Sequence, residues 1–234
     1  MLDSAGRRFG PAEWQALGSL AATMVLMAVL LFWPAGTLAW ARGWWFLLAF
    51  VALTIIAMAY LWRVNPEIFA ARRRFHKGSK SWDIVVATLA MIAVAAILPV
   101  AALDDGRFHW SQPPVWIVLV GYLLFAAAYA WITQAQAVNR HFEPTVRIQT
   151  DRNHTVIDTG PYAVMRHPGY IGAAGMVIGM ALMLGSLWAL VPAAAAIVIL
   201  AGRTLGEEAV LKAELPGYAE YTQRVRYRWV PGVW

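Results

Sequence analysis

The chain alternates between long apolar runs and shorter polar segments. Four of the runs are long enough to cross the hydrocarbon core of a bilayer as a helix, which takes about 20 residues. They cover residues 17–34, 44–62, 84–103 and 115–138. We therefore predict four transmembrane helices in the first 138 residues.

A fifth apolar run extends from residue 171 to residue 201. Gly185 and Ser186 divide it into arms of about 14 and 16 residues, each short for a full span. This division predicts a helical hairpin. In the first arm, Gly175 and Gly179 have the spacing that lets two membrane helices approach closely. The predicted fold is thus an all-α integral membrane protein with about four transmembrane helices and a helical hairpin in its C-terminal half.

Composition supports a membrane location and a defined orientation. Hydrophobic residues make up 60% of the chain and charged residues 14%, against roughly 25% charged residues in a soluble domain. Of the 19 Lys and Arg residues, 17 fall on the side of the amino terminus, and only Arg42 and Arg107 fall on the other. Because inner loops of membrane proteins carry the positive charge, the amino terminus, residues 139–169 and the C-terminal tail are predicted to be cytoplasmic.

The basic residues lie in loops rather than on one amphipathic face, so we predict no nucleic-acid partner. A cluster at residues 72–80 is most simply part of the inner positive charge. The chain has no cysteine, which excludes disulfides and thiolate nucleophiles. His141, His154 and His167 lack the i,i+4 spacing of a helical metal site, so no metal is predicted.

Polar residues gather at two places in the C-terminal half. The first is residues 160–172, where Arg166 and His167 stand directly before an apolar run and are costly to place near hydrocarbon. Pro161 and Pro168 both interrupt a helix, so this segment can present backbone and side chains to a ligand.

The second cluster is Arg203, Glu207 and Glu208, on a predicted helix that continues from the hairpin. Arg203 and Glu207 have i,i+4 spacing, so a surface ion pair of about 0.2–0.5 kcal/mol is one interpretation. The other is that the two adjacent acids balance a cationic ligand. The spacing alone leaves both interpretations open.

The two clusters together resemble the isoprenylcysteine carboxyl methyltransferase family, to which the phospholipid methyltransferases are related. The resemblance rests on motifs in the expected order. These are Gly-Pro-Tyr-x-x-x-Arg-His-Pro-x-Tyr-x-Gly at 160–172, Leu-Gly-Ser at 184–186, Arg203 with Glu207-Glu208, and Pro-Gly-Tyr-x-x-Tyr at 216–221. It covers residues 139–234. Over residues 1–138 the chain matches only as generic membrane helices, so we predict one membrane domain whose catalytic half is 139–234.

The resemblance implies S-adenosylmethionine as the methyl donor, in a cytoplasmic pocket made by the loop and tail. From the chemistry of the two clusters we expect the cofactor to be bound by Gly160, Pro161, Tyr162, His167, Pro168, Tyr170, Glu207 and Glu208. For a carboxylate acceptor, Arg166 or Arg203 would hold the acceptor. For an amine acceptor, Glu208 or His167 would take up the proton. We expect a lipophilic or lipidated substrate from the bilayer.

Two other classes remain open on the sequence alone. One is a membrane reductase that uses a nicotinamide cofactor, for which more basic residues beside the 160–172 segment would be expected. The other is a transporter or scaffold, which predicts ionisable residues near the centre of the spans. The predicted spans are uncharged at their centres.

Overall fold

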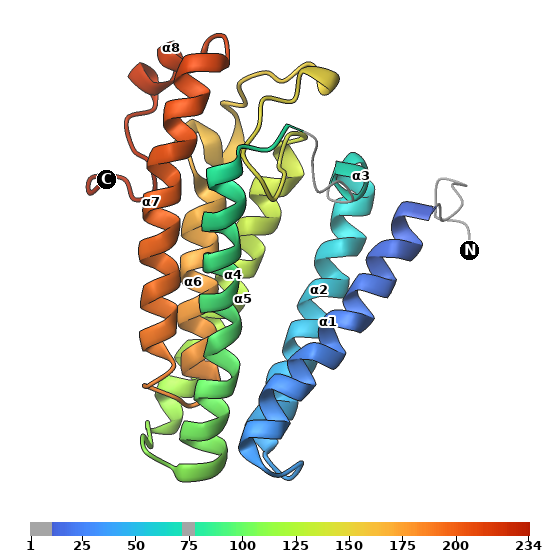
Figure 1. Cartoon of the computed structure of the whole chain (residues 1–234), viewed down its shortest axis with the longest axis vertical. Coiled ribbons are helices and arrows are strands. Elements are labelled where there is room, and N and C mark those ends of the chain that lie inside the picture. The colour runs from blue at the N-terminus through green and yellow to red at the C-terminus, as the bar shows by residue number, and fades with distance from the viewer. Residues whose placement is uncertain (1–10, 72–77) are drawn as a thin grey trace.

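The computed structural model describes residues 11–71 and 78–234, and no strand occurs among them (Figure 1). The basic residues 72–74 and 77 lie outside the described residues. The α-helices are α1 (Pro11–Ala35), α2 (Ala41–Val64), α3 (Glu67–Ala71), α4 (Ser81–Ala101), α5 (Val115–Val138), α6 (Pro168–Met183), α7 (Leu190–Glu214) and α8 (Tyr218–Arg224). A π-helical segment, η1 (Ala102–Phe108), extends α4, and the short 3₁₀ helices η2 (Thr150–Arg152) and η3 (Gly160–Ala163) lie in the loop after α5.

Five helices of the described chain are long and apolar enough to span a membrane. Four of these spans confirm the predicted transmembrane helices, and they are Leu17–Ala35, Ala41–Val64, Ser81–Phe108 and Val115–Val138. The fifth is α7. The structure is therefore that of an all-helical integral membrane protein.

The connections between the helices lie at two opposite ends of the bundle (Figure 1). At one end, called here the turn end, lie the connections 36–40, 109–114 and 184–189. At the other, called the site end, lie α8 and the long loop between α5 and α6. Helices α4 to α7 form one group, and α1 and α2 lie beside it as a pair.

The predicted hairpin is α6 and α7, but its second arm is longer than predicted. Helix α7 runs for 25 residues, from Leu190 to Glu214, and qualifies as a full span. The sequence predicts an apolar arm to residue 201 and a helix that continues from it through the Arg203 cluster. The continuation is confirmed, and Arg203 and Glu208 both have partners on other elements, as described below. The prediction of two short arms was therefore wrong for the second arm.

Asp104 and Asp105 stabilise the turn end through hydrogen bonds and an ion pair. Asp104, which is fully buried, accepts hydrogen bonds from the backbone N–H of Ser111 (2.6 Å) and from the hydroxyl of Ser186 (2.6 Å). The neighbouring Asp105 forms an ion pair with Arg42. Because Ser186 is in the hairpin turn, α6 and α7 reach the same end of the bundle as η1.

Glycines set the close contact between α5 and α6. A Cβ atom added to Gly179 would lie 2.7 Å from the backbone nitrogen of Phe125, and one added to Gly175 would lie 2.8 Å from Cβ of Ala128. On α5, a Cβ atom on Gly121 would overlap the backbone nitrogen of Met183. The interpretation of Gly175 and Gly179 as a close-packing pair is confirmed. The contact fixes the position of α6, whose first residue adjoins the polar 160–167 segment.

We expect Gly179→Ala to lower the free energy of unfolding by about 1–3 kcal/mol, because the added methyl group forces the two backbones apart. Gly202→Ala on α7 is the matched control, since a Cβ atom added there would have no other atom within 4 Å and alanine favours a helix over glycine. The measurement is thermal unfolding in detergent, followed by tryptophan fluorescence. Equal midpoints for the two variants would contradict the close contact.

Candidate active site at the site end

The polar 160–172 segment is held against the C-terminal tail by its backbone. The N–H groups of Arg166 and His167 donate to the carbonyls of Tyr227 and Arg228, both at 2.9 Å. Pro168 then begins α6, at a position where proline costs no helical hydrogen bond. The tail thus lies beside the first turn of α6, although some 60 residues separate the two in sequence.

Glu208 of α7 joins these segments through its side chain. It is 3% exposed, and Arg166 donates its Nε–H to Glu208 Oε1. On the same carboxylate, Nε2 of His167 lies 3.3 Å from Oε1, and Nε of Arg228 donates to Oε2 at 2.9 Å. The structure therefore brings together Arg166, His167 and Glu208, three of the residues singled out from the sequence.

The guanidinium of Arg166 also bonds to the tail. Its Nη1 donates to the carbonyls of Val225 and Arg226, both at 2.8 Å, and the residue is only 6% exposed. Charged hydrogen bonds of this kind are stronger than neutral ones. Arg166 therefore links the start of α6, the end of α7 and the tail.

Glu207 has a different environment from its neighbour. Its Oε2 accepts a hydrogen bond of 2.5 Å from the hydroxyl of Tyr170, and Nδ1 of His167 lies 4.0 Å from the same oxygen. Among the described residues, none donates a hydrogen bond to its other oxygen, Oε1. The side chain is 25% exposed, against 4% for that of Glu208. Glu207 is therefore the more accessible of the two carboxylates.

Arg203 does not form the i,i+4 pair with Glu207 that its spacing allowed. Its guanidinium binds Asp83 of α4 in a bidentate pair, with 2.7 Å from Nε to Oδ1 and 3.0 Å from Nη2 to Oδ2. Nη2 also donates to the carbonyl of Pro144, and the guanidinium carbon lies 5.7 Å from the ring centroid of Tyr170. Arg203 thus joins α7 to α4 beside the site.

Asp83 was missed by the sequence analysis. It is fully buried, and besides Arg203 it accepts the backbone N–H of Val146 at 2.7 Å. A single acid in the first turn of an apolar helix was its only signal. Its partner on α7 is 120 residues away, so spacing along the chain gave no indication of the pair.

The segment Gly160-Pro161-Tyr162 forms η3, beside the end of α5. Gly160 has φ of +56°, and a Cβ atom there would lie 3.3 Å from the side chain of Val138. The hydroxyl of Tyr162 accepts a hydrogen bond from Asn139 at 2.9 Å, and its carbonyl accepts one from the hydroxyl of Tyr221 at 2.7 Å. Burial raises the pKa of Tyr162, so its hydroxyl stays protonated. Asn139, directly after α5, and Tyr221 of α8 therefore hold η3 in place.

Tyr218, the first residue of α8, has a buried hydroxyl with no hydrogen-bonding partner in the described chain. The residue is 5% exposed. Leaving such a group unsatisfied costs about 1–3 kcal/mol. Burial, and then the charges of Glu208 and Glu207, raise the pKa of Tyr218. Its hydroxyl therefore stays protonated.

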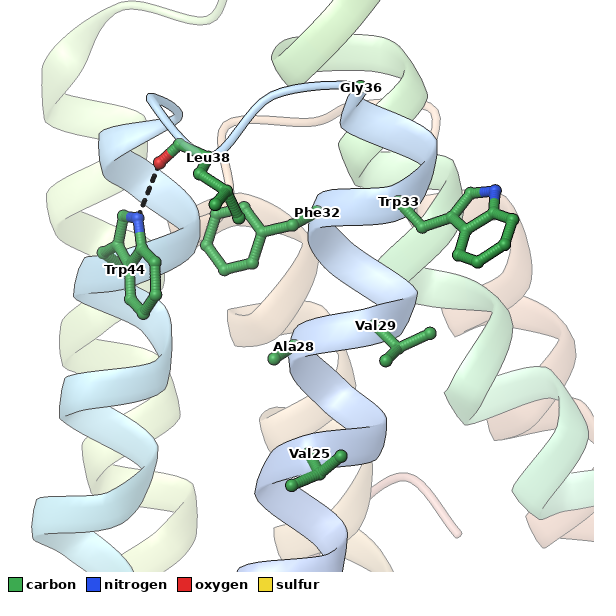
Figure 2. A pocket seen from close by; sticks show the side chains of 8 residues that line it. All are labelled: Val25, Ala28, Val29, Phe32, Trp33, Gly36, Leu38 and Trp44. Atoms are coloured by element: carbon green, nitrogen blue, oxygen red, sulfur yellow. Dashed lines mark hydrogen bonds between the residues drawn. The ribbon is translucent and has the colours of Figure 1, made fainter.

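An apolar hollow of about 670 Å³ lies elsewhere, toward the turn end between α1 and α2 (Figure 2). Its lining is Val25, Ala28, Val29, Phe32, Trp33, Gly36, Leu38 and Trp44. The indole N–H of Trp44 is already bonded to the carbonyl of Leu38 at 2.8 Å. This hollow has no charged group with which to bind a polar cofactor.

Comparison with known families gives a match to part of the chain. Residues 116–215 match the model of the phospholipid methyltransferase family. The match runs from α5 to the turn after α7 and includes the 160–172 segment, Arg203, Glu207 and Glu208. Because this family is related to the isoprenylcysteine carboxyl methyltransferases, the resemblance noted in the sequence is confirmed. No curated protein matches the chain.

We expect Glu208→Gln to lower the free energy of unfolding by about 3 kcal/mol, because it removes the counter-charge of a buried arginine. Glu207→Gln is the control, and its more exposed carboxylate should cost less than about 1 kcal/mol. Both variants would be measured by thermal unfolding without ligand. Similar losses for the two would contradict the assignment of Glu208 as the structural centre.

A second prediction concerns pH and the loop after α5. The rings of His141 and His154 lie 4.5 Å apart, and burial together with the charges of His141 and Arg147 lowers the pKa of His154 to about 4. Burial also lowers the pKa of His141. Since the unfolded chain binds these protons at about pH 6.5, the stability that the neutral rings provide is complete above pH 6.5 and is lost toward pH 4.

His154→Gln should reduce this pH dependence. We expect the midpoint of thermal unfolding to fall between pH 7 and pH 5 in the wild type and to fall less in the variant. A fall of the same size in both proteins would show that His154 does not carry the effect.

Proposed function

We propose that the chain is an S-adenosylmethionine-dependent methyltransferase that methylates a lipophilic acceptor from the bilayer. The acceptor is the carboxylate of an isoprenylcysteine-like molecule or the amine of a lipid. The observation that carries the proposal is the buried junction of Arg166, His167 and Glu208, beside the more accessible Glu207. This junction lies in the segment that matches the methyltransferase family.

The residues at the junction fit the chemical groups of the cofactor. S-adenosylmethionine carries a sulfonium, an ammonium, a carboxylate, two ribose hydroxyls and an adenine. Glu207 has one carboxylate oxygen that no described residue reaches, and it would accept from the ammonium or the ribose hydroxyls. The backbone of Gly160-Pro161-Tyr162 and the unpartnered hydroxyl of Tyr218 add further polar groups.

The other residues predicted for the site would mainly hold Glu207 and His167 in place. In the described chain Arg166 and Glu208 bind each other, and Arg203 binds Asp83. Pro168 starts α6 directly after His167, and Tyr170 is held by its hydrogen bond to Glu207. These contacts would keep Glu207 and His167 in fixed places around the bound ligand.

The bound cofactor supplies an electrophilic methyl group. The chain would hold the acceptor in line with it and keep water out, and such alignment is worth roughly 7–11 kcal/mol of the barrier. A carboxylate acceptor needs no base. An amine acceptor has to lose a proton, and His167, with 3.3 Å to Glu208 and 4.0 Å to Glu207, would take it up.

The site end would face the cytoplasm. The sequence assigns 17 of the 19 Lys and Arg residues to the inner side of the membrane. The other two are Arg42 and Arg107, and both lie at the turn end. Arg42 pairs there with Asp105. The positive-inside rule then puts both chain termini and the proposed pocket on the cytoplasmic side.

Calorimetry with S-adenosylhomocysteine tests the cofactor. We expect saturable binding by the wild type in detergent or nanodiscs, and binding weaker by about tenfold in Glu207→Gln, which loses a charged acceptor. His167→Ala should also weaken it. Glu220→Gln, an exposed glutamate of α8, is the matched control and should bind as the wild type does. No binding by folded wild type would contradict the proposal.

The acceptor would then be identified with labelled methyl donor and membrane lipid extract. A carboxyl methyl ester releases labelled methanol in base, whereas a methylated amine keeps its label. The two forms of the product therefore distinguish the two acceptor classes.

A further inference from the structure

The hydroxyl of Tyr218 is the one buried side-chain polar atom in the described residues that lacks a hydrogen-bonding partner. Three other tyrosines around the junction each have one. Tyr162 is bonded to Asn139, Tyr170 to Glu207, and Tyr221 to the carbonyl of Tyr162. Since buried polar groups are nearly always satisfied, an exception calls for an explanation.

The ring of Tyr218 is fixed by packing. Gly217, with φ of +81°, ends the turn after α7, and Tyr218 then packs in an apolar cluster with Leu215, Tyr221 and Val225. The ring centroids of Tyr218 and Tyr221 are 5.5 Å apart. A phenylalanine would fill the same cluster, so packing does not account for the hydroxyl.

The ring lies beside the junction, because its cluster includes Val225, whose carbonyl accepts a hydrogen bond from Nη1 of Arg166. The groups whose charges act on its hydroxyl are Glu208, Glu207 and Arg166, which come from α7 and from the start of α6. None of them donates to it or accepts from it in the described chain. The hydroxyl therefore keeps an unused hydrogen-bond donor beside the junction.

We propose that the hydroxyl of Tyr218 binds the amino-acid end of the methyl donor and of its demethylated product. This proposal rests on the proposed function and names a contact within the same pocket. The amino-acid end carries an ammonium and a carboxylate. The ammonium is complementary to Glu207, while the carboxylate needs a donor, and the guanidinium of Arg166 is already neutralised by Glu208. The Tyr218 hydroxyl supplies that donor.

Two ligands distinguish this contact from others in the pocket. S-adenosylhomocysteine contains the amino-acid end, whereas 5′-methylthioadenosine has the same nucleoside and sulfur without it. In Tyr218→Phe we expect the Kd for S-adenosylhomocysteine to rise roughly 5- to 10-fold, as for the loss of one hydrogen bond. The Kd for 5′-methylthioadenosine should change less than twofold.

Stability without ligand gives a second readout. Because the hydroxyl has no partner in the protein, its removal in Tyr218→Phe should leave the midpoint of thermal unfolding unchanged or raise it. Tyr221→Phe is the contrasting variant, since it removes a hydroxyl that donates to Tyr162, and its midpoint should fall. Tyr60→Phe is the control for affinity, because the Tyr60 hydroxyl on α2 is bonded to Gln134 of α5 and to none of the junction residues, and it should bind both ligands as the wild type does.

Three results would overturn the proposal. One is a folded Tyr218→Phe protein with unchanged affinity for S-adenosylhomocysteine. Another is an equal loss of affinity for both ligands, which would place the contact on the nucleoside. The third is a fall in unfolding midpoint as large as that of Tyr221→Phe, which would mean that the hydroxyl has an internal role. If wild type binds neither ligand, the proposed function itself fails, and that result is distinct from the other three.

Discussion

The buried carboxylate of Glu208 is the interaction on which the site end depends. A carboxylate in a low-dielectric interior costs several kcal/mol unless cations and hydrogen bonds compensate it. Here Arg166 and Arg228 supply the compensation, one from the loop before α6 and one from the tail. The charge on α7 therefore requires both segments to come to the same point. The backbone hydrogen bonds from Arg166 and His167 to Tyr227 and Arg228 hold the same two segments together.

Apolar and polar contacts along the helices hold the elements of that junction in position. Glycines on α5 and α6 bring the two backbones together, and Asp104 secures the far end of the hairpin through Ser186. Asp83 and Arg203 then hold the start of α4 against α7 near the site. A rigid set of helices thus carries an irregular polar segment, which is the arrangement in which binding residues are commonly found.

The sequence predicted the elements of this arrangement better than their connections. The four apolar runs could be recognised by length and the hairpin by Gly185 and Ser186, and the two polar clusters were correctly expected to meet. The continuation of the second arm through the Arg203 cluster was predicted. That this arm is a full span was not, because the partners of Arg203 and Glu208 lie on elements distant in sequence. Asp83 was missed for the same reason, since its partner is distant in sequence and only the fold brings them together. The unpartnered hydroxyl of Tyr218 is a property of the packed structure and has no counterpart in a sequence pattern.

The contrast between Glu207 and Glu208 gives the adjacent acids separate roles. Successive residues on a helix point about 100° apart, so one carboxylate enters the junction while the other faces Tyr170. Glu208 is neutralised by arginines, whereas the nearest donors to Glu207 are the Tyr170 hydroxyl and the more distant His167. Under the proposed function, Glu207 therefore keeps negative charge for a ligand. The methyl donor has one net positive charge, which its product lacks, so the charge of Glu207 favours the donor over the product. The same carboxylate would thus help both to bind the donor and to release what remains after transfer.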